Sequence, residues 1–283
     1  MCIINNRILD MDNIKISVIT VCWNCVGDIE KTLKSVIGQT YPNIEYIIVD
    51  GASTDGTLEI VERYRDNIST LISEPDGGIY NAMNKGVRVA TGQWCIFMNA
   101  GDVFASKDVV SEMFSINHPK KCTKVYYGNT TDVNEKQKEV SFKATSVFPA
   151  ILRCQPYCHQ SAFFNIKDKR EPFFNEKYKI ASDYNTSLEY FVKYGKDAFE
   201  YRNLIISKFA AYGGVSTNKK NDKKKHLEFI DIYKNHKICH KRYLIERFKF
   251  FIFYQQPLHV LSSMLKKYTE SRTQSNQKNR LIR

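Results

Sequence analysis

Apolar and polar positions follow two different periods through the first hundred residues of the chain. The segment Lys15–Trp23, KISVITVCW, is a nearly continuous apolar run rich in β-branched residues, which is typical of a strand buried on both faces of a sheet. Over Ile29–Ile37 the apolar residues instead recur at helical spacing, after Asp28 as a candidate cap and before Gly38 as a terminating glycine. The pattern therefore predicts a strand followed by a helix.

This order repeats along the chain. The next expected elements are strand Ile44–Val49, helix Leu58–Arg65, strand Thr70–Ser73, helix Gly78–Val89 and strand Gln93–Met98. Beyond Thr123 the pattern loosens into short strands, Val125–Tyr127 and Ser161–Phe164, and one clear helix, Asp183–Tyr194. Strands that alternate with helices predict the α/β class, with a doubly wound sheet whose ligands bind beyond the carboxyl ends of the strands.

Polar side chains gather at those strand ends. They are Asn24 after the first strand, Asp50 and Asp55 after the second, Glu74 and Asp76 after the third, and Asn99 and Asp102 after the fourth. Because parallel strands end at the same edge of a sheet, one rim is expected to collect these carboxylates.

The positive charge of the chain lies at one end. Ser216–Arg283 holds 17 basic and 5 acidic residues, which accounts for the whole net charge of +12, and the preceding residues hold 25 of each. Such a tail fits nucleic acid or an anionic membrane surface as a partner. It carries no recognisable nucleic-acid-binding motif, and the carboxylate-rich rim would repel phosphate unless a metal intervened.

The eight cysteines, together with an N-terminus that lacks the pattern of a secretory signal, predict reduced thiols in the cytoplasm. No run of 18 apolar residues occurs, so no spanning helix is expected. Cys22 and Cys25 match a redox CxxC spacing, and Cys154 and Cys158 with His159 could be imagined as a zinc site. Buried inert thiols are the simpler interpretation.

Several ordered motifs between Lys15 and Ser216 resemble glycosyltransferase family 2, in a branch associated with O-antigen and capsule assembly. They read SVITVCWN, EYIIVDGASTDGT, SEPDGGIYNAMNKG, WCIFMNAGD, CHQSAFF, ASDYN and YGGVS. The resemblance implies a GT-A fold, a Rossmann-like doubly wound mixed sheet. It also implies a non-processive inverting transferase that moves a sugar from a nucleoside diphosphate, expected to be UDP, to a lipid-linked or surface-polysaccharide acceptor. A sugar nucleotidyltransferase and a nucleic-acid-binding protein are the alternatives.

The resemblance divides the chain into an extension, 1–13, a catalytic domain, 14–215, and a basic helical tail, 216–283. Within the catalytic domain, 14–105 is expected to hold the nucleotide-sugar and 106–215 the acceptor. In the tail, apolar residues recur at helical spacing between Tyr243 and Ile252 among cations, which predicts an amphipathic helix at the inner face of the cell membrane or packed on the catalytic domain.

By the resemblance, nucleotide contacts fall to Asp50, Asp76, Lys85 and Asn99. Taken alone, Asp50 before a glycine is a common turn residue, and Lys85 fits a solvated helix face. Asp55 is expected to cap the following helix instead. Glycines followed by the N-terminus of a helix, as in Asp76-Gly77-Gly78, favour an anion such as a diphosphate.

The segment NAGD stands where many relatives carry three aspartates around an alanine. Asn99 and Gly101 replace two of them, and Asp102 is retained as the implied ligand of Mn²⁺ or Mg²⁺. One or two protein carboxylates are enough for a cation that a nucleotide diphosphate also coordinates.

Asp183 matches the family's general base, which removes the proton of the acceptor hydroxyl from the side of the sugar opposite the diphosphate. Without the resemblance, a helix cap with no chemical role is the favoured interpretation of this residue. His159 is either a packed histidine or a contact to the diphosphate or acceptor.

Overall fold

The computed structural model describes residues 14–116, 118–133, 138–152, 154–167, 172–209, 218–236 and 244–245. The chain divides into two compact units, Met1–Lys219 and Lys220–Arg283. In the second unit the structure gives helix α8 (Asp222–Asn235). Most of the amphipathic helix expected in the tail, and Gly213-Gly214 of the YGGVS motif, lie outside the described residues.

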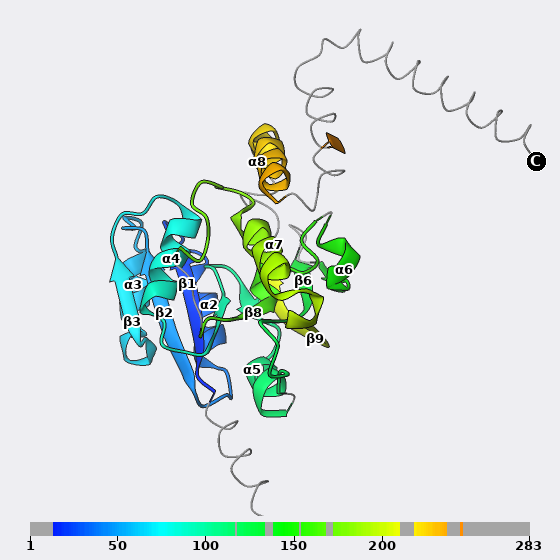
Figure 1. Cartoon of the computed structure of the whole chain (residues 1–283). Coiled ribbons are helices and arrows are strands. Elements are labelled where there is room, and N and C mark those ends of the chain that lie inside the picture. The colour runs from blue at the N-terminus through cyan, green and yellow to red at the C-terminus, as the bar shows by residue number, and fades with distance from the viewer. Residues whose placement is uncertain are drawn as a thin grey trace, which may run out of the picture. The chain divides into compact units, whose positions relative to one another are not determined.

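A mixed β-sheet runs through the first unit (Figure 1). In the described residues its strand order is β3-β2-β1-β4-β8-β6-β9-β5, and β7 pairs with β6. The strands are β1 (Ile16–Cys22), β2 (Ile44–Asp50), β3 (Thr70–Ser73), β4 (Trp94–Phe97), β5 (Val103–Phe104), β6 (Val125–Val133), β7 (Glu139–Phe142), β8 (Ala162–Asn165) and β9 (Phe199–Phe209). This arrangement confirms the predicted α/β class and mixed sheet.

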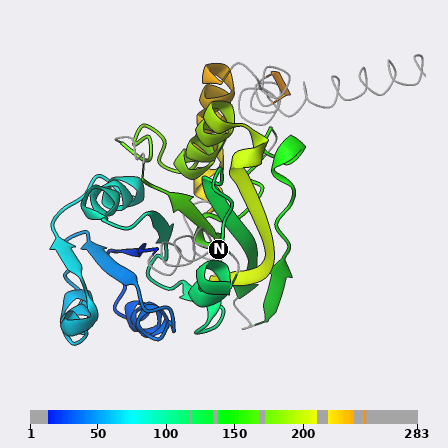
Figure 2. The same cartoon turned by 60° about the horizontal axis from the view of Figure 1, so that its bottom comes forward.

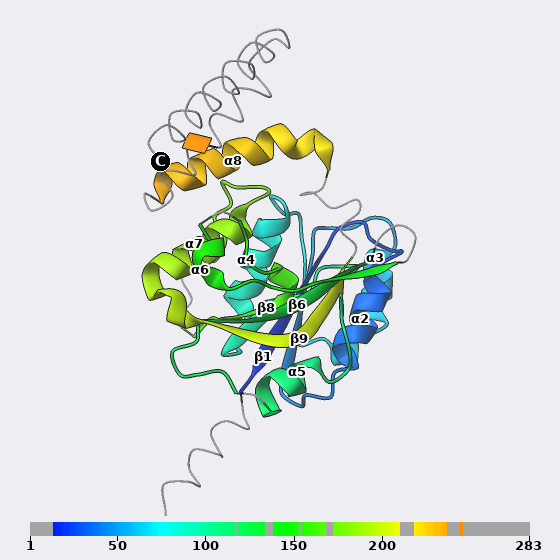
Figure 3. The same ribbon diagram turned by 90° about the vertical axis from the view of Figure 1, so that its right-hand side faces the viewer.

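Helices cover both faces of the sheet (Figure 3). They are α2 (Ile29–Ile37), α3 (Thr57–Glu62), α4 (Ile79–Val89), α5 (Val109–Ser111), α6 (Val147–Ala150) and α7 (Ser182–Tyr194). Fully buried Leu33 of α2 and Phe114, which follows α5, share one apolar core with the sheet. On the other face α4 lies directly on β1, because a Cβ added at Gly86 would come within 2.5 Å of Ile19 Cγ2.

The sheet changes direction at β8, and this change positions the site. Strands β3, β2, β1 and β4 are parallel, whereas β8 runs antiparallel to β4, with Trp94 opposite Asn165. Residues that lead into β8 therefore arrive at the carboxyl end of β4. As a result, residues from the second half of the unit join the rim that the first four strands form.

Four strands differ from the sequence prediction, and two of them, β5 and β7, are short strands that were not predicted. Strand β6 continues to Val133 rather than ending at Tyr127, and β9, which was not predicted, pairs with it in parallel (Figure 2). Polar residues such as Asp132 in β6 and Arg202 in β9 interrupt the apolar runs that identify strands. The backbone pairing of the two strands, not side-chain pattern, keeps these segments extended.

The predicted cap of α2 also needs a correction. Asp28 precedes α2, but its carboxylate makes no capping hydrogen bond and instead accepts one from Lys31 Nζ at 2.6 Å. The lysine three residues along competes for the oxygen that would otherwise reach the helix amides.

Candidate active site

The loops after β1 and β2 are joined to each other by hydrogen bonds. Asn24 N donates to Ser53 Oγ at 2.8 Å, and Thr54 N donates to Asn24 Oδ1 at 2.9 Å. Asp55 accepts a hydrogen bond from Thr57 N at 3.0 Å, at the first residue of α3. The predicted capping of this helix by Asp55 is wrong, because Gly56 is the N-cap and no side chain makes a capping hydrogen bond there. Asp55 instead stabilises the turn that leads into α3, and the two loops form one rim.

Asp50 lies beneath this rim, fully buried at the end of β2. Ser53 N donates to its carboxylate at 3.0 Å and Ser73 Oγ at 2.8 Å, and Ser53 Oγ makes a further short hydrogen bond. A carboxylate that accepts three such bonds fixes the loop that follows it. Asp50 reaches a bound molecule only by exchanging one of these donors for it.

Trp23 and Asp76 both lie against Gly51, the residue after Asp50, which makes room for them. A Cβ added at Gly51 would come within 2.6 Å of Asp76 Oδ2 and 3.3 Å of Trp23 Cδ1. Trp23 is 67% exposed, which leaves a large aromatic surface beside the carboxylate. An exposed indole next to hydrogen-bonding groups is suited to stacking on a flat ring.

The glycine loop before α4 is held by side chains at both ends. Asp76 Oδ1 accepts a hydrogen bond from Gly78 N at 2.7 Å, and Gly78 has a φ of +113°, which a side chain would disfavour. Lys85 Nζ lies 2.8 Å from Glu74 Oε1 and donates to the Pro75 carbonyl at 2.8 Å. In this structure Lys85 therefore holds the segment that leads into the glycine loop.

Asp102 lies at the end of β4, almost completely buried. Its Oδ2 accepts a hydrogen bond from Asn99 N at 3.2 Å. Burial raises the pKa of Asp102 to about 6, although the positive potential of His159 and a hydrogen bond from Gln160 oppose the rise. The Asn99 Oδ1 atom is buried and has no hydrogen-bond partner among the described residues.

A short turn before β8, η3 (His159–Ser161), connects this end of β4 to α7. His159 Nδ1 lies 3.3 Å from Asp183 Oδ2, and its Nε2 lies 3.4 Å from Asn99 Nδ2. The tautomer that donates from Nδ1 to Asp183 leaves Nε2 to accept from Asn99. The next residue, Gln160, hydrogen bonds to Asp102. Two adjacent side chains thus contact the two carboxylates.

Asp183 is the second residue of α7, and 21% of its side chain is exposed. Its Oδ1 accepts hydrogen bonds from Tyr184 N at 2.8 Å and from Tyr80 Oη at 3.1 Å. Burial alone would raise the pKa of this carboxyl. The hydrogen bond and charge of His159, with those from Tyr184 and Tyr80, outweigh burial and hold the pKa of Asp183 below its ordinary value. Asp183 is therefore ionised at neutral pH and can accept a proton.

The family model for glycosyl transferase family 2 matches residues 17–184, which include the rim, η3 and Asp183. The chain belongs to glycosyltransferase family 2. The sequence alone left three classes of function open, and a glycosyltransferase was one of them. Membership of this family decides against the sugar nucleotidyltransferase.

The names of relatives of this family-2 glycosyltransferase refer to different products. It is 26% identical over 208 residues to the PGL/p-HBAD biosynthesis glycosyltransferase of Mycobacterium tuberculosis, which covers 71% of this chain and 78% of the relative. It is also 33% identical over 116 residues to Bacillus subtilis TuaG, whose name refers to teichuronic acid biosynthesis. That alignment covers 40% of this chain and 46% of TuaG.

Solved structures share the fold at 18% sequence identity. S. aureus TarS 1–349 in complex with UDP-GlcNAc has a TM-score of 0.61 and matches 86% of this chain and 76% of that one. The mannosyltransferase PcManGT from Pyrobaculum calidifontis, in complex with GDP-Man and Mn²⁺, has a TM-score of 0.56 and matches 79% and 64%. The fold of this family-2 glycosyltransferase is therefore GT-A.

The structure brings most of the predicted site residues of this glycosyltransferase into two groups. Asn99, Asp102, His159 and Asp183 are connected through the η3 turn, and Asp76 lies with Trp23 against Gly51, the residue after Asp50. Lys85 belongs to neither group.

Sequence reasoning missed Trp23, Gln160 and Tyr80. An aromatic residue directly after a buried strand, and a glutamine directly after the candidate histidine, are signals that could have pointed to the first two. Tyr80 reaches Asp183 across 103 positions of the sequence, and no local pattern predicts that contact.

The oxygen atoms around Asp102 fit a hard divalent cation. The Asp102 carboxylate and the unpartnered Asn99 Oδ1 are ligands of the type that Mg²⁺ and Mn²⁺ prefer. Across the described residues, no cluster of three or more His, Cys, Asp or Glu side chains could hold a metal by itself. A cation at this rim would thus need oxygens from a bound diphosphate and from water.

Proposed function

We propose that this glycosyltransferase moves one sugar from a UDP-sugar to a hydroxyl group of a lipid-linked or surface-polysaccharide acceptor, with inversion at the anomeric carbon. One observation carries the proposal: His159 and Gln160, adjacent on η3, contact Asp183 and Asp102. This arrangement supports a base on one side of the donor sugar and a diphosphate-binding carboxylate on the other.

Asp183 is the proposed general base. In-line displacement with inversion requires the acceptor hydroxyl to attack from the side opposite the leaving diphosphate, and a carboxylate there must be ionised to take the proton. The hydrogen bonds that lower the pKa of Asp183 keep it in that state. The Nδ1–H of His159, 3.3 Å from Asp183 Oδ2, orients the carboxylate and leaves one lone pair of Oδ2 for the hydroxyl.

Asp102 and Asn99 are the proposed ligands of a Mn²⁺ or Mg²⁺ ion. A divalent cation bound there supplies positive charge that stabilises the departing diphosphate. Gln160 orients the Asp102 carboxylate, and burial of both side chains excludes water from the developing negative charge.

The nucleotide is proposed to bind over Trp23, Asp50 and Asp76. Stacking of the uracil on the exposed indole would place its imide N–H near Asp76, or near Asp50 after exchange of the Ser53 hydroxyl. The diphosphate is proposed to lie at the glycine loop before α4, where the amides of Gly77 and Gly78 would exchange their present acceptors, Asn81 Oδ1 and Asp76 Oδ1, for phosphate oxygens. Lys85 then supports this loop through Glu74 and the Pro75 carbonyl rather than touching phosphate directly.

The acceptor proposal rests on the basic tail and on the products named for the relatives. Teichuronic acid in the name of TuaG supports a surface polysaccharide. The 17 basic residues of Ser216–Arg283 support binding to the anionic inner face of the cell membrane, where a lipid-linked acceptor would lie. Among the described residues, no helix is long and apolar enough to cross a membrane.

Replacement of Asp183 by asparagine tests the proposal. Asparagine keeps the shape but cannot accept the proton, so turnover of a UDP-sugar should fall roughly 10²- to 10⁴-fold while UDP affinity stays nearly constant. Glu176→Gln is the matched control. Glu176 is also a hydrogen-bonded carboxylate, but its donors among the described residues are Asn81 and Asn84 of α4 and not His159. Retention of a tenth of the turnover by Asp183→Asn would contradict the proposal, as would a product that keeps the anomeric configuration of the donor.

A further inference from the structure

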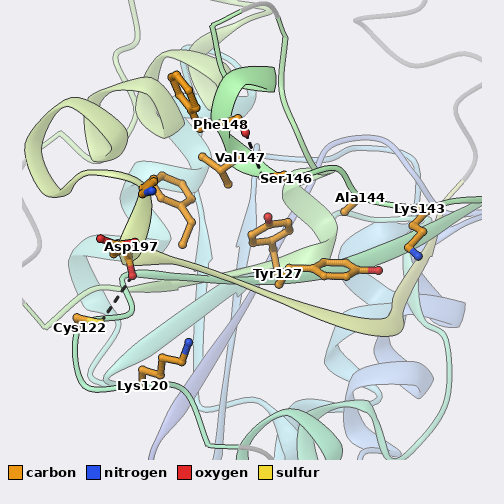
Figure 4. A pocket seen from close by; sticks show the side chains of 12 residues that line it. Lys120, Cys122, Tyr127, Lys143, Ala144, Ser146, Val147, Phe148 and Asp197 are labelled. Carbon is orange, nitrogen blue, oxygen red and sulfur yellow. Dashed lines mark hydrogen bonds between the residues drawn. The ribbon is translucent and has the colours of Figure 1, made fainter.

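A groove that none of the candidate site residues lines lies over strands β6 and β9. It is bounded by α6 on one side and by the turn η4 (Lys196–Ala198) on the other, and its volume is about 850 Å³. Four aromatic side chains and three lysines line it, and Asp197 is the only acidic residue among the described residues of its lining (Figure 4). We call it the β6–β9 groove. Its volume lies in the upper part of the range of roughly 300–1,000 Å³ that is typical of small-molecule sites.

Aromatic rings form the floor and one wall of the groove. Tyr127 of β6 and Tyr201 of β9 lie with ring centroids 5.7 Å apart. Their hydroxyl groups donate hydrogen bonds to protein acceptors, Tyr127 to the Thr145 carbonyl at 3.1 Å and Tyr201 to Asn129 Oδ1 at 3.0 Å. Phe148 of α6, which is 51% exposed, lines the groove as well. Tyr127 is buried beneath the floor, whereas Tyr201, Phe199 and Phe148 are at least partly exposed. Their rings are therefore open to ligands with apolar C–H surfaces, such as sugar rings.

Three cations point to the charge of the ligand. Lys120, Lys143 and Lys196 are exposed and come from three separate segments around the groove. None of the three ammonium groups has an ion pair or hydrogen bond to another described side chain. Against the single carboxylate of Asp197 they leave the groove cationic, so an anionic ligand is favoured over a neutral one.

We propose that the β6–β9 groove is a second binding site for saccharide, and that it binds a segment of the acceptor glycan carrying carboxylate or phosphate groups. The aromatic faces would take the sugar rings and the lysines the anionic groups. This inference rests on the proposed function, because it assigns the groove to the acceptor of that reaction.

Contacts connect the groove to the helix that carries the proposed base. Tyr127 packs on Tyr157 at 4.7 Å between centroids, and Tyr157 Oη donates to Ser187 Oγ at 2.9 Å. Ser187 lies one turn after Asp183 in α7, and the η4 turn that follows α7 contributes Lys196 to the groove. The 13 residues of α7 span roughly 20 Å at 1.5 Å per residue. An acceptor of several sugars could therefore occupy the groove while its end reaches Asp183.

Binding of defined oligosaccharides to the full-length chain tests the inference by calorimetry. The probes are a galacturonic acid hexasaccharide for carboxylates, an oligomannoside carrying mannose 6-phosphate for phosphates, and neutral maltohexaose. A six-residue oligothymidylate tests for nucleic acid. We expect one or both anionic saccharides to bind at least 5-fold more tightly than maltohexaose and the oligothymidylate, and the stronger of the two identifies the anionic group.

Two pairs of variants locate the binding. Lys143→Gln with Lys196→Gln should weaken the anionic saccharide roughly 3- to 10-fold, because it removes two exposed charge contacts. The same double change at Lys107 and Lys167, which are exposed and lie outside the groove, should not. Phe148→Ala should also weaken binding, and Phe142→Ala is its control, since each phenylalanine is 51% exposed and Phe142 does not line the groove.

UDP titrations on the same samples separate this inference from the proposed function. If UDP binds but no anionic saccharide does, or if the groove variants bind it as tightly as their controls do, the groove assignment is wrong and the donor site is untouched. Tighter binding of maltohexaose or oligothymidylate overturns it in the same way. If UDP itself does not bind, the proposed function fails. If an anionic saccharide still binds in that case, and only the groove variants bind it more weakly, the β6–β9 groove remains a saccharide site.

Discussion

Asp102→Asn is expected to make the ligand-free protein more stable while it removes the proposed metal ligand. Burial raises the pKa of Asp102 from 3.8 to about 6. In the unfolded chain the carboxyl ionises at its ordinary pKa, so the folded state binds more protons between these values and stability falls as pH rises through that window. A difference of about 2 pKa units corresponds to roughly 3 kcal/mol at pH 7.

Asparagine carries no charge and so avoids this cost at every pH. Urea unfolding of both proteins without metal or nucleotide, at pH 5 and at pH 7, measures the effect. The variant should gain about 1 kcal/mol relative to the parent between the two pH values, because most of the remaining ionisation of the folded carboxyl occurs there. The comparison cancels the other titrating groups, which both proteins share.

In the same samples, Mn²⁺ should improve the UDP affinity of the parent and leave that of the variant unchanged. A variant that is less stable than the parent at pH 7, or whose stability difference does not change with pH, would refute the reasoning. Either result would mean that Asp102 is not ionised at a cost in the folded protein.

Trp23→Ala should weaken UDP binding by roughly 5-fold or more, because stacking on one base contributes about 1–3 kcal/mol. Because Trp23 is 67% exposed, the midpoint of urea unfolding of the variant should equal that of the parent. If calorimetry gives the variant and the parent the same UDP affinity, the indole is not part of the nucleotide site. For the tail, the full chain should sediment with anionic vesicles at low salt and be released as salt rises, and a chain ending at Ser216 should not bind them. Equal sedimentation of both chains would contradict the membrane role of the tail.

The sequence was sufficient to predict strands whose side chains are all buried. Strands β1 and β2 are buried on both faces, and their continuous apolar runs identify them without any knowledge of their neighbours. Strand β9 has partly exposed residues along most of its length and register shifts against β6. Its charged residues therefore interrupt the apolar pattern by which a strand is predicted. Its extended form depends on a partner strand more than seventy residues away in the sequence.

The candidate site divides in the same way. Asp102 and Asp183 could be singled out because they match ordered motifs, but their connection through η3 depends on the antiparallel pairing of β8 with β4. The sequence also gave no indication that Asp50 would be saturated by hydrogen bonds from its own loop, or that Lys85 would face Glu74. Such contacts are decided by side chains that converge from different elements.

The η3 turn limits how far apart the Asp102 and Asp183 carboxylates can lie. Because His159 and Gln160 are neighbours in the chain, the separation of Asp183 from Asp102 is limited by the reach of two side chains on one short turn and not by movement between larger parts of the protein. If these carboxylates flank the donor sugar as proposed, every sugar that reacts must fit the same gap. New donor preferences would then arise by changes in the loops around the gap, while the width of the gap stays constant.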